Sequence, residues 1–192
     1  CSRSNVTFNP TATDNCGVKT LVSVPPSGST FPLGTTTVTV TATDASGNQS
    51  TCSFKVFVLD TQNSVITCPP NLVLSAEPGR CVRSNVTYIV TATDNCSITN
   101  VVSTPTSGSP FPVGVTTVTN VALDAGSNIT ICTFTVTVTD DQSPQITCPA
   151  NLVVTTDAGR CSRSNVTFNV SATDNCTVTN LVSFPPSGKI GR

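Results

Sequence analysis

The chain has 192 residues, of which nine are Lys or Arg, ten are Asp or Glu and none is histidine. This near-neutral balance excludes a charge field that would recruit nucleic acid or an anionic membrane surface. The absence of histidine removes the commonest general base and the Ser-His and Cys-His nucleophile pairs, so we expect no enzyme.

Alternation of apolar and polar residues with a period of two predicts a series of short strands. In chain order the segments are TTTVTVTAT (35–43), STCSFKVFV (50–58), NLVLSA (71–76), NVTYIVTAT (85–93) and NLVVTT (151–156). In the fourth segment Val86, Tyr88, Val90 and Ala92 are expected to face inward. Turn sequences such as PPSGS, DASGN, EPGR, DAGSN and DAGR separate the strands, and no segment keeps a helical period. The pattern predicts an all-β fold, a β-sandwich of Ig-like type.

Ten cysteines reveal a strict repeat of 80 residues. The equivalent positions are Cys1, Cys81 and Cys161; Cys16, Cys96 and Cys176; Cys52 and Cys132; and Cys68 and Cys148. Such spacing without an insertion indicates one structural unit repeated in tandem. The sequence has no close C-x2-C pair of the kind that binds structural zinc, so we expect disulfides formed in an oxidising compartment.

We divide the chain into a first repeat at residues 1–59, a complete second repeat at 60–140 and a third repeat at 141–192. The first lacks the opening strand that VITCPPNLVLSA supplies to the second, and the third lacks the C-terminal strands. No apolar run approaches the roughly 18 residues of a membrane span. Without an initiator Met or a signal peptide, the chain is expected to be a processed or excised piece of a secreted protein.

A unit that combines ITCPANLVVTTDAGRC, ATDNC, FPVGVTTVT and CTFTVTV resembles the hyalin repeat, or HYR, domain family. The resemblance covers essentially the whole chain and implies an Ig-like, extracellular domain of the kind found in tandem in adhesive and matrix proteins. One position departs from the repeat, because Asn120 replaces Val40 on the inward face of its strand. This predicts an edge strand or a bulge there, or else a misassigned residue.

Sequons for N-linked glycans are the clearest chemical signal. They occur at Asn5, Asn48, Asn85, Asn95, Asn128, Asn165, Asn169 and Asn175. On a strand the Asn and the Thr two residues later share one face, so in NVTF both would face solvent while Val and Phe point inward. We expect covalent glycans first at Asn5, Asn85 and Asn165, then at Asn48, Asn128 and Asn169. Cysteine in the middle of the sequon lowers the expectation at Asn95 and Asn175.

Acidic residues in turns and at repeat boundaries are candidate calcium ligands. They are Asp14, Asp94 and Asp174 in TDNC, Asp44 and Asp124 in the DA turns, and Asp60, Asp140 and Asp141 at the boundaries. The alternative, which we favour, is that these side chains cap turns through hydrogen bonds to the backbone, with no metal or other cofactor. The repeated arginines Arg3, Arg83 and Arg163 are either solvated or paired with Asp at the boundaries.

An Ig-like trace makes Cys68 and Cys132 candidates for one disulfide, which would leave Cys81 with Cys96. Six cysteines allow many connectivities, and the sequence alone fixes none. The same scheme in the incomplete repeats pairs Cys1 with Cys16 and Cys161 with Cys176, and it leaves Cys52 and Cys148 as complementary partners. We therefore hypothesise head-to-tail addition of the opening strand around Cys148 to the first repeat of the next copy, locked by a Cys148–Cys52 bond. The N-terminal Cys1 would then follow a cut after the arginine that precedes its equivalents.

Two functions remain open on this basis. The favoured one is an extracellular structural protein, a glycosylated subunit of a fibre, matrix or surface filament that binds copies of itself. The alternative is an adhesion or ligand-binding module of a larger tandem-repeat protein, or simply a window of a longer tandem chain. Short polar loops such as DNCGVKT favour the structural function, because recognition loops concentrate aromatic residues and arginine.

Overall fold

The computed structural model describes residues 1–188, and the described residues contain strands and turns but no helix. None of them could therefore cross a membrane as a helix. The chain forms two compact units. Unit 1 comprises Cys1–Cys68, Val90–Thr104 and Thr119–Thr133, and unit 2 comprises Pro69–Ile89, Pro105–Val118 and the residues from Phe134 onward.

Short strands make up both units. In chain order they are β1 (Ser2–Val6), β2 (Val18–Val24), β3 (Ser29–Pro32), β4 (Gly34–Asp44), β5 (Gln49–Val58), β6 (Val65–Thr67), β7 (Leu72–Ser75), β8 (Val82–Arg83), β9 (Thr91–Thr93), β10 (Ile98–Thr104), β11 (Phe111–Pro112), β12 (Gly114–Asp124), β13 (Ile129–Thr139), β14 (Gln145–Thr147) and β15 (Ser171–Thr173). The expected all-β architecture of tandem Ig-like sandwich repeats is confirmed.

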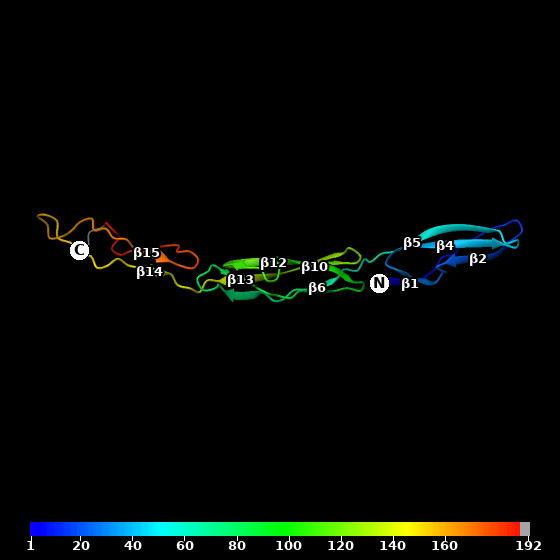
Figure 1. Cartoon of the computed structure of the whole chain (residues 1–192), viewed down its shortest axis with the longest axis horizontal. Coiled ribbons are helices and arrows are strands. Elements are labelled where there is room, and N and C mark those ends of the chain that lie inside the picture. The colour runs from blue at the N-terminus through cyan, green and yellow to red at the C-terminus, as the bar shows by residue number, and fades with distance from the viewer. Residues whose placement is uncertain (189–192) are drawn as a thin grey trace. The chain divides into compact units, whose positions relative to one another are not determined.

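In unit 1 the first repeat is built on the antiparallel sheet β2-β4-β5 (Figure 1). β4 and β5 pair without a register shift, from Gly34 opposite Val58 to Thr43 opposite Gln49. β1 and β3 form a second, two-stranded ladder. Two layers of strands are what a sandwich needs to enclose a core.

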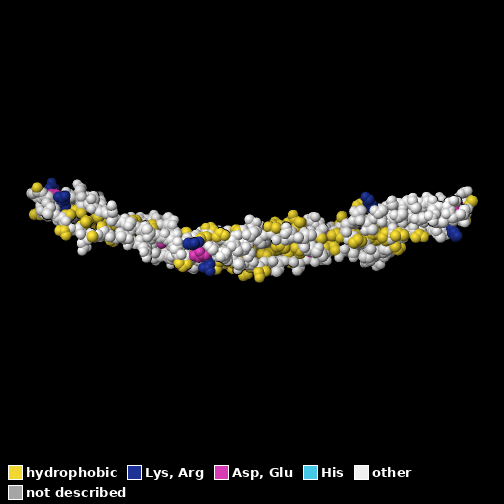
Figure 2. Space-filling view, in the orientation of Figure 1, with side chains coloured by type: hydrophobic (Ala, Val, Ile, Leu, Met, Phe, Trp, Pro, Cys, Tyr) yellow, Lys and Arg dark blue, Asp and Glu magenta, His cyan; other side chains and the backbone are white. Residues whose placement is uncertain are grey.

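The core of the first repeat follows the alternation of β4. Phe31, Val38 and Val40 are buried, and partly buried apolar side chains such as Val6 and Val56 pack against them. Each fully buried side chain of this size contributes about 1.5–3 kcal/mol relative to exposure. The outward threonines of β4 leave the surface polar, and Figure 2 shows few charged side chains among broad uncharged areas and bands of apolar atoms. With Phe31, Val38 and Val40 as its buried residues, the core of the first repeat is small.

The second repeat contributes to both units. In unit 1, β10 pairs with β12 and β6 pairs with β9, both antiparallel. In unit 2, β7 lies parallel to β13, and β8 pairs with β11. The third repeat lies in unit 2, where its opening strand β14 pairs with β15 in the register that β6 and β9 use.

Predicted and observed strands differ in instructive ways. The predicted strand at residues 85–93 forms a ladder only at β9, although Val86, Tyr88, Val90 and Ala92 face inward as expected. The predicted strand at 151–156 is wrong, because no described residue pairs with this segment. Conversely, β2 and β10 begin within DNCGVKT (14–20) and DNCSITN (94–100), which were expected to be loops. Alternation reports burial, whereas a strand also needs a hydrogen-bonded neighbour.

Tyr88 is half-buried and packs edge-to-face on Phe134, with ring centroids 4.9 Å apart. Its hydroxyl donates a hydrogen bond to the Pro105 carbonyl oxygen. In the first repeat Phe8 and Phe54 form the equivalent ring pair at 5.0 Å. A ring pair of this geometry adds about 0.5–1.5 kcal/mol beyond area burial, so one aromatic contact holds the segment after the sequon in each of the first two repeats.

Asn120 is fully buried in a central strand, so the expectation of an edge or a bulge at this position is wrong. β12 lies between β10 and β13, and Asn120 stands opposite Ser103 in a regular part of the ladder. Its amide nitrogen lies 3.1 Å from the Cys68 sulfur and 3.4 Å from the Cys132 carbonyl oxygen. The amide nitrogen therefore takes its partners from the two cysteines of the disulfide, while the side-chain oxygen has no partner among the described residues.

Asn120→Val is expected to leave the free energy of unfolding unchanged or to raise it by up to about 1 kcal/mol, since it removes an unpaired buried oxygen together with a weak sulfur contact. The reciprocal change Val40→Asn is expected to cost about 1–3 kcal/mol, because no disulfide beside Val40 offers a partner. Thermal and urea unfolding of both variants measure the difference. Equal destabilisation by the two changes would contradict this account.

Candidate functional site

The three sequons that recur every 80 residues lie at the surface. Asn5, Asn85 and Asn165 are exposed and share a left-handed backbone, with φ of 54°, 51° and 54°. Asn tolerates this conformation better than most residues. The Val that follows each of them is turned inward, most completely at Val86 with 4% exposure. The outward direction expected for these amides is therefore observed.

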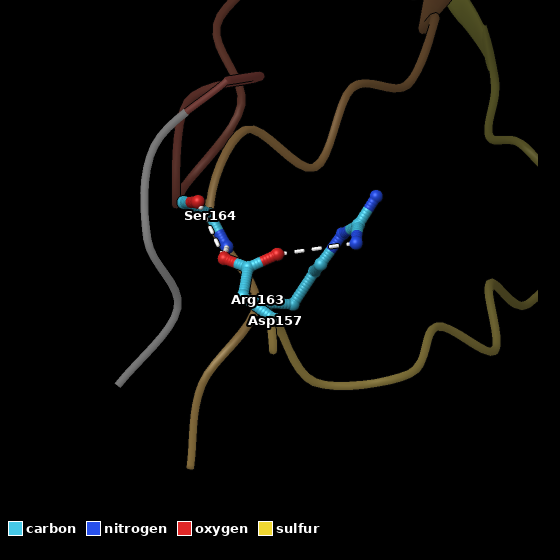
Figure 3. A network of polar contacts seen from close by, with 3 residues as sticks. All are labelled: Asp157, Arg163 and Ser164. Atoms are coloured by element: carbon cyan, nitrogen blue, oxygen red, sulfur yellow. Dashed lines mark hydrogen bonds and ion pairs between the residues drawn. The ribbon is translucent and has the colours of Figure 1, made fainter. Parts of the chain in front are cut away.

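An acidic residue orders the turn that precedes this sequon. In the third repeat one oxygen of Asp157 accepts hydrogen bonds from the Ser164 backbone N–H (2.9 Å) and hydroxyl (2.6 Å), as Figure 3 shows. The other oxygen pairs with Arg163 at 3.1 Å. These bonds, those from Ser164 above all, hold the pKa of Asp157 below its ordinary value. Arg163 thus pairs with an aspartate of its own repeat and not at a repeat boundary.

The remaining sequons differ in how free their amides are. Asn48 and Asn169 are exposed, and the Asn48 amide donates to Asp44. The Asn128 amide donates to the Asp124 carboxylate and to the carbonyl oxygens of Asp60 and Gln62. The Asn175 amide donates to the Arg80 carbonyl oxygen and to Asp140, and Asn95 is exposed. Asn128 and Asn175 are therefore structural residues.

We expect N-linked glycans at Asn5, Asn85, Asn165, Asn48 and Asn169, and little or none at Asn128 and Asn175. A glycan replaces one amide hydrogen, and it would crowd the carbonyl groups that Asn128 and Asn175 contact. Enzymatic release of glycans in heavy-oxygen water, followed by peptide mass mapping, gives the occupancy of each site. Full occupancy of Asn128 in the folded protein would contradict the assignment.

The disulfides connect successive repeats as well as strands within one repeat. Cys68 bonds Cys132 within the second repeat, as expected. The expected pairs Cys81–Cys96, Cys1–Cys16 and Cys161–Cys176 are wrong. Instead Cys1 bonds Cys96 and Cys81 bonds Cys176, each pair 95 residues apart with Cα atoms 4.5 and 4.7 Å apart. Both cross-repeat bonds join the cysteine that lies four residues before the repeated sequon, Cys1 or Cys81, to the DNC cysteine of the next repeat. Cys16, Cys52, Cys148 and Cys161 are free and exposed.

Carboxylates gather where the first repeat meets the second. Oxygens of Asp60, Asp94 and Asp124 lie within 4.8 Å of one another. Asp124 is only 2% exposed, and one oxygen of Asp60 is buried with no hydrogen-bond partner in residues 1–188. Asp140 and Asp174 form the equivalent cluster with Cys176 in unit 2. Calcium prefers such oxygen ligands, so calcium binding at Asp60, Asp94 and Asp124 stays an untested alternative to the favoured turn capping.

The other candidate ligands follow the turn-capping alternative. Asp14, Asp94 and Asp174 each accept a hydrogen bond from the backbone N–H of the cysteine two residues later, at 2.7–2.9 Å. Asp44 accepts bonds from Asn48, and Asp141 accepts one from Ser75. Turn capping therefore accounts for Asp14 and Asp44.

Asp124 holds the turn Asp124–Asn128 together. Its oxygens accept the Asn128 backbone N–H at 2.8 Å and side-chain amide at 2.9 Å. Burial of the carboxyl raises its pKa, but the hydrogen bonds from Asn128, Gly126 and Ser127 outweigh burial and hold the pKa below the ordinary 3.8. The folded state therefore favours the ionised carboxylate.

Since the pKa of Asp124 is lowered by folding, its contribution to stability is complete above pH 3.8 and is lost as the pH falls through the folded value. The midpoint of thermal unfolding of the wild type should thus fall as the pH is lowered below 3.8. Asp124→Asn should lower the midpoint at pH 7 and flatten that acid dependence. An unchanged acid slope in the variant would show that other carboxylates carry it.

A groove on the first repeat lies where the second repeat holds its opening strand. A cavity of about 230 Å³ is lined by Thr11, Ala12, Thr13, Val40, Ala42 and Cys52. Thr11–Thr13 is equivalent to β9, which pairs with β6 in the second repeat, and Cys52 is equivalent to Cys132, which bonds Cys68. A second cavity of about 150 Å³, which includes Asp14, Asp44 and Asn48, shares Thr13, Ala42 and Ser50 with the first. Together they form the acceptor groove.

The edge of β5 also lacks the neighbouring strand that the second repeat has at this place. Phe54 is 37% exposed and Phe57 is 64% exposed, whereas Phe134 of the second repeat is 3% exposed. The second repeat covers Val136 and Val138 with the parallel strand β7, and the Asn71 side chain accepts the Thr135 backbone N–H at 2.9 Å. The first repeat thus presents an unpaired edge.

The sequence pattern of the HYR domain matches residues 1–58 and 59–138. The chain belongs to the HYR domain family. It is 40% identical over 182 residues to hyalin of Strongylocentrotus purpuratus and 32% identical over 171 residues to hyalin of Lytechinus variegatus. These alignments cover 91% and 86% of the chain but only 15% and 32% of the two hyalins. A serine-rich adhesin for platelets of Staphylococcus aureus is 30% identical over 125 residues, 58% of this HYR chain and 9% of the adhesin.

Proposed function

We propose that this HYR chain is an extracellular structural repeat protein of the adhesion type whose copies join head to tail. Its similarity to hyalins and to a bacterial adhesin supports the extracellular, adhesive class. Disulfides between successive repeats support secretion into an oxidising compartment. The acceptor groove with its free cysteine is the observation that carries the head-to-tail step.

The occupant that fits the acceptor groove is the opening segment of a third repeat in another copy. QITCPANLVV of the third repeat corresponds to VITCPPNLVL of the second. Cys148 is free and exposed, and Leu152, Val153 and Val154 are 53%, 97% and 52% exposed. In the groove, Cys148 would meet Cys52, and Leu152–Val154 would cover the apolar edge of β5. Unsatisfied strand edges on both sides favour this addition.

The addition requires an exchange of strands. β14 pairs with β15 within one chain, in the register Gln145–Thr173 to Thr147–Ser171. Entry into the acceptor groove replaces β15 by Thr11–Thr13 of the neighbour, so the three ladder positions are conserved. Such an exchange of equivalent elements is the low-cost route to association used in domain swapping. The contact is heterologous, and repeated addition without ring closure generates an open filament.

We expect a ladder on non-reducing gels whose steps are about 20 kDa plus the mass of the glycans, and reduction should collapse this ladder to one band. Cys52→Ser and Cys148→Ser should each be unable to form this ladder when alone, since each lacks one partner thiol. An equal mixture of the two variants should form a single reducible dimer, because only the donor of one variant and the acceptor of the other remain. Electron microscopy of the wild type should show filaments.

Cys16→Ser and Cys161→Ser serve as matched controls, since both thiols are also free and exposed. These two variants should form the wild-type ladder. A mixture of Cys52→Ser and Cys148→Ser that stays monomeric would overturn the head-to-tail proposal and favour a window of a longer tandem chain.

A further inference from the structure

The turn after each DA pair has the same backbone in the first two repeats. In DASGN the Asp44 N–H donates to the Asn48 carbonyl at 3.1 Å, and the Gly47 N–H donates to the Asp44 carbonyl at 3.3 Å. In DAGSN the equivalent bonds run from Asp124 to Asn128 at 3.2 Å and from Ser127 to Asp124 at 3.3 Å. The order of glycine and serine is nevertheless reversed. Because the two turns share the same backbone hydrogen bonds, the reversed order must be explained by a contact outside the turn.

That contact is the close approach of Asp60 to Gly126. A Cβ atom at this position would lie 2.7 Å from both the Cβ and the carbonyl oxygen of Asp60, and 2.9 Å from the Asn128 amide nitrogen. The other described glycines have open space at their Cβ positions and a left-handed backbone, whereas Gly126 has neither. Gly126 is therefore required by the close approach of the linker between the first two repeats and not by its own backbone conformation.

The reversed order of glycine and serine strains the backbone at Ser127. This serine adopts φ of 69°, in the left-handed region where the equivalent Gly47 lies at 89°. A side chain at such a position is strained, so the glycine would be better placed at 127 if the turn were alone. The second repeat thus accepts backbone strain at Ser127 to make room for Asp60 at Gly126.

Hydrogen bonds fix the linker on the same surface. The Asn128 amide donates to the carbonyl oxygens of Asp60 at 3.3 Å and Gln62 at 3.1 Å. Further along, Thr130 donates to the Ser64 carbonyl oxygen at 2.9 Å, and Ser64 is 4% exposed. We call Gly126, Asn128 and Thr130 the linker socket. The first repeat has Ser46, Asn48 and Ser50 at the equivalent positions.

We infer that the order of glycine and serine in this turn determines whether a repeat accepts the linker of a preceding repeat. Gly126-Ser127 opens the socket to an Asp-Thr-Gln segment, and Ser46-Gly47 closes it, because the Ser46 Cβ occupies the space that the linker aspartate needs. Position 126 is therefore a specificity-determining residue of the array. Its partner is an acidic linker of another HYR repeat.

Closure of the first socket also constrains a second copy. Asp140–Gln142 precedes β14 in the third repeat, as Asp60–Gln62 precedes β6 in the second. When β14 of one copy lies in the acceptor groove of another, the Asp140–Gln142 segment that precedes it therefore cannot pack against Ser46 as Asp60–Gln62 packs against Gly126. This consequence rests on the proposed strand addition, whereas the inference about Gly126 and its test do not.

The test transplants the turn of the first repeat into the second as Gly126→Ser with Ser127→Gly, in a Cys52→Ser background that cannot form the proposed filament. We expect limited proteolysis within residues 59–64 to be roughly tenfold faster than in the same background without the swap, since the linker spends more time detached. Alkylation and mass mapping should also find more free Cys96 after equilibration with glutathione. Gly126→Ala, with the smallest added side chain, should show the same direction of change.

Two controls separate the linker contact from the turn itself. Ser127→Gly alone removes the left-handed serine and keeps Gly126, so the linker should stay as protected as in the parent. The reciprocal Ser46→Gly with Gly47→Ser should leave residues 59–64 equally protected. Retention of the Cys68–Cys132 bond shows that the second repeat is folded. Parental cleavage rates and a complete Cys1–Cys96 bond in both the swapped variant and Gly126→Ala would overturn the inference.

Discussion

Each repeat depends on its opening strand being held against the rest of the sandwich. In the second repeat the Cys68–Cys132 bond fixes the end of β6, and β7 then covers the apolar edge of β13. With only 10% charged residues and a small core, the unit has little else to resist opening. In the first repeat, which has no opening strand, the equivalent sheet leaves Phe54 37% exposed, whereas Phe134 of the second repeat is 3% exposed.

The same constraint explains why the boundaries between repeats carry so much of the polar chemistry. Asp124, Asn128 and Asp60 are buried or hydrogen-bonded because the linker fills space beside a turn that would otherwise face water. Cys1–Cys96 and Cys81–Cys176 then connect neighbouring repeats covalently. Sequons whose amides serve this boundary, such as Asn128, are structural, and those on the outer surface, such as Asn85, are open to modification.

Much of the fold could be predicted from the sequence because burial alternates with the side chains. Val86, Tyr88, Val90 and Ala92 were identified as inward-facing on alternation alone, and the Cys68–Cys132 pair on the course of an Ig-like chain. Cross-repeat disulfides could not be found, because the 80-residue period is the same whether Cys96 bonds Cys81 or Cys1. Asn120 was misjudged because its partner, the Cys68 sulfur, lies 52 residues away in the chain, just after β6. The order of Gly126 and Ser127 can be read from DAGSN, but only the position of Asp60 beside Gly126 explains why glycine comes first.

The bond between Cys1 and Cys96 alters how the chain would behave under mechanical load. A pull applied beyond these two cysteines passes through the sulfur atoms and bypasses the 95-residue span that they enclose. That span, which contains the first repeat and the beginning of the second, would otherwise extend to about 3.3–3.6 Å per residue, or roughly 300 Å, if it unravelled. Cys81 and Cys176 enclose a second, overlapping span of the same length. A protein built in this way would stretch little before it breaks, and reducing agents would turn it from an inextensible tether into a compliant one.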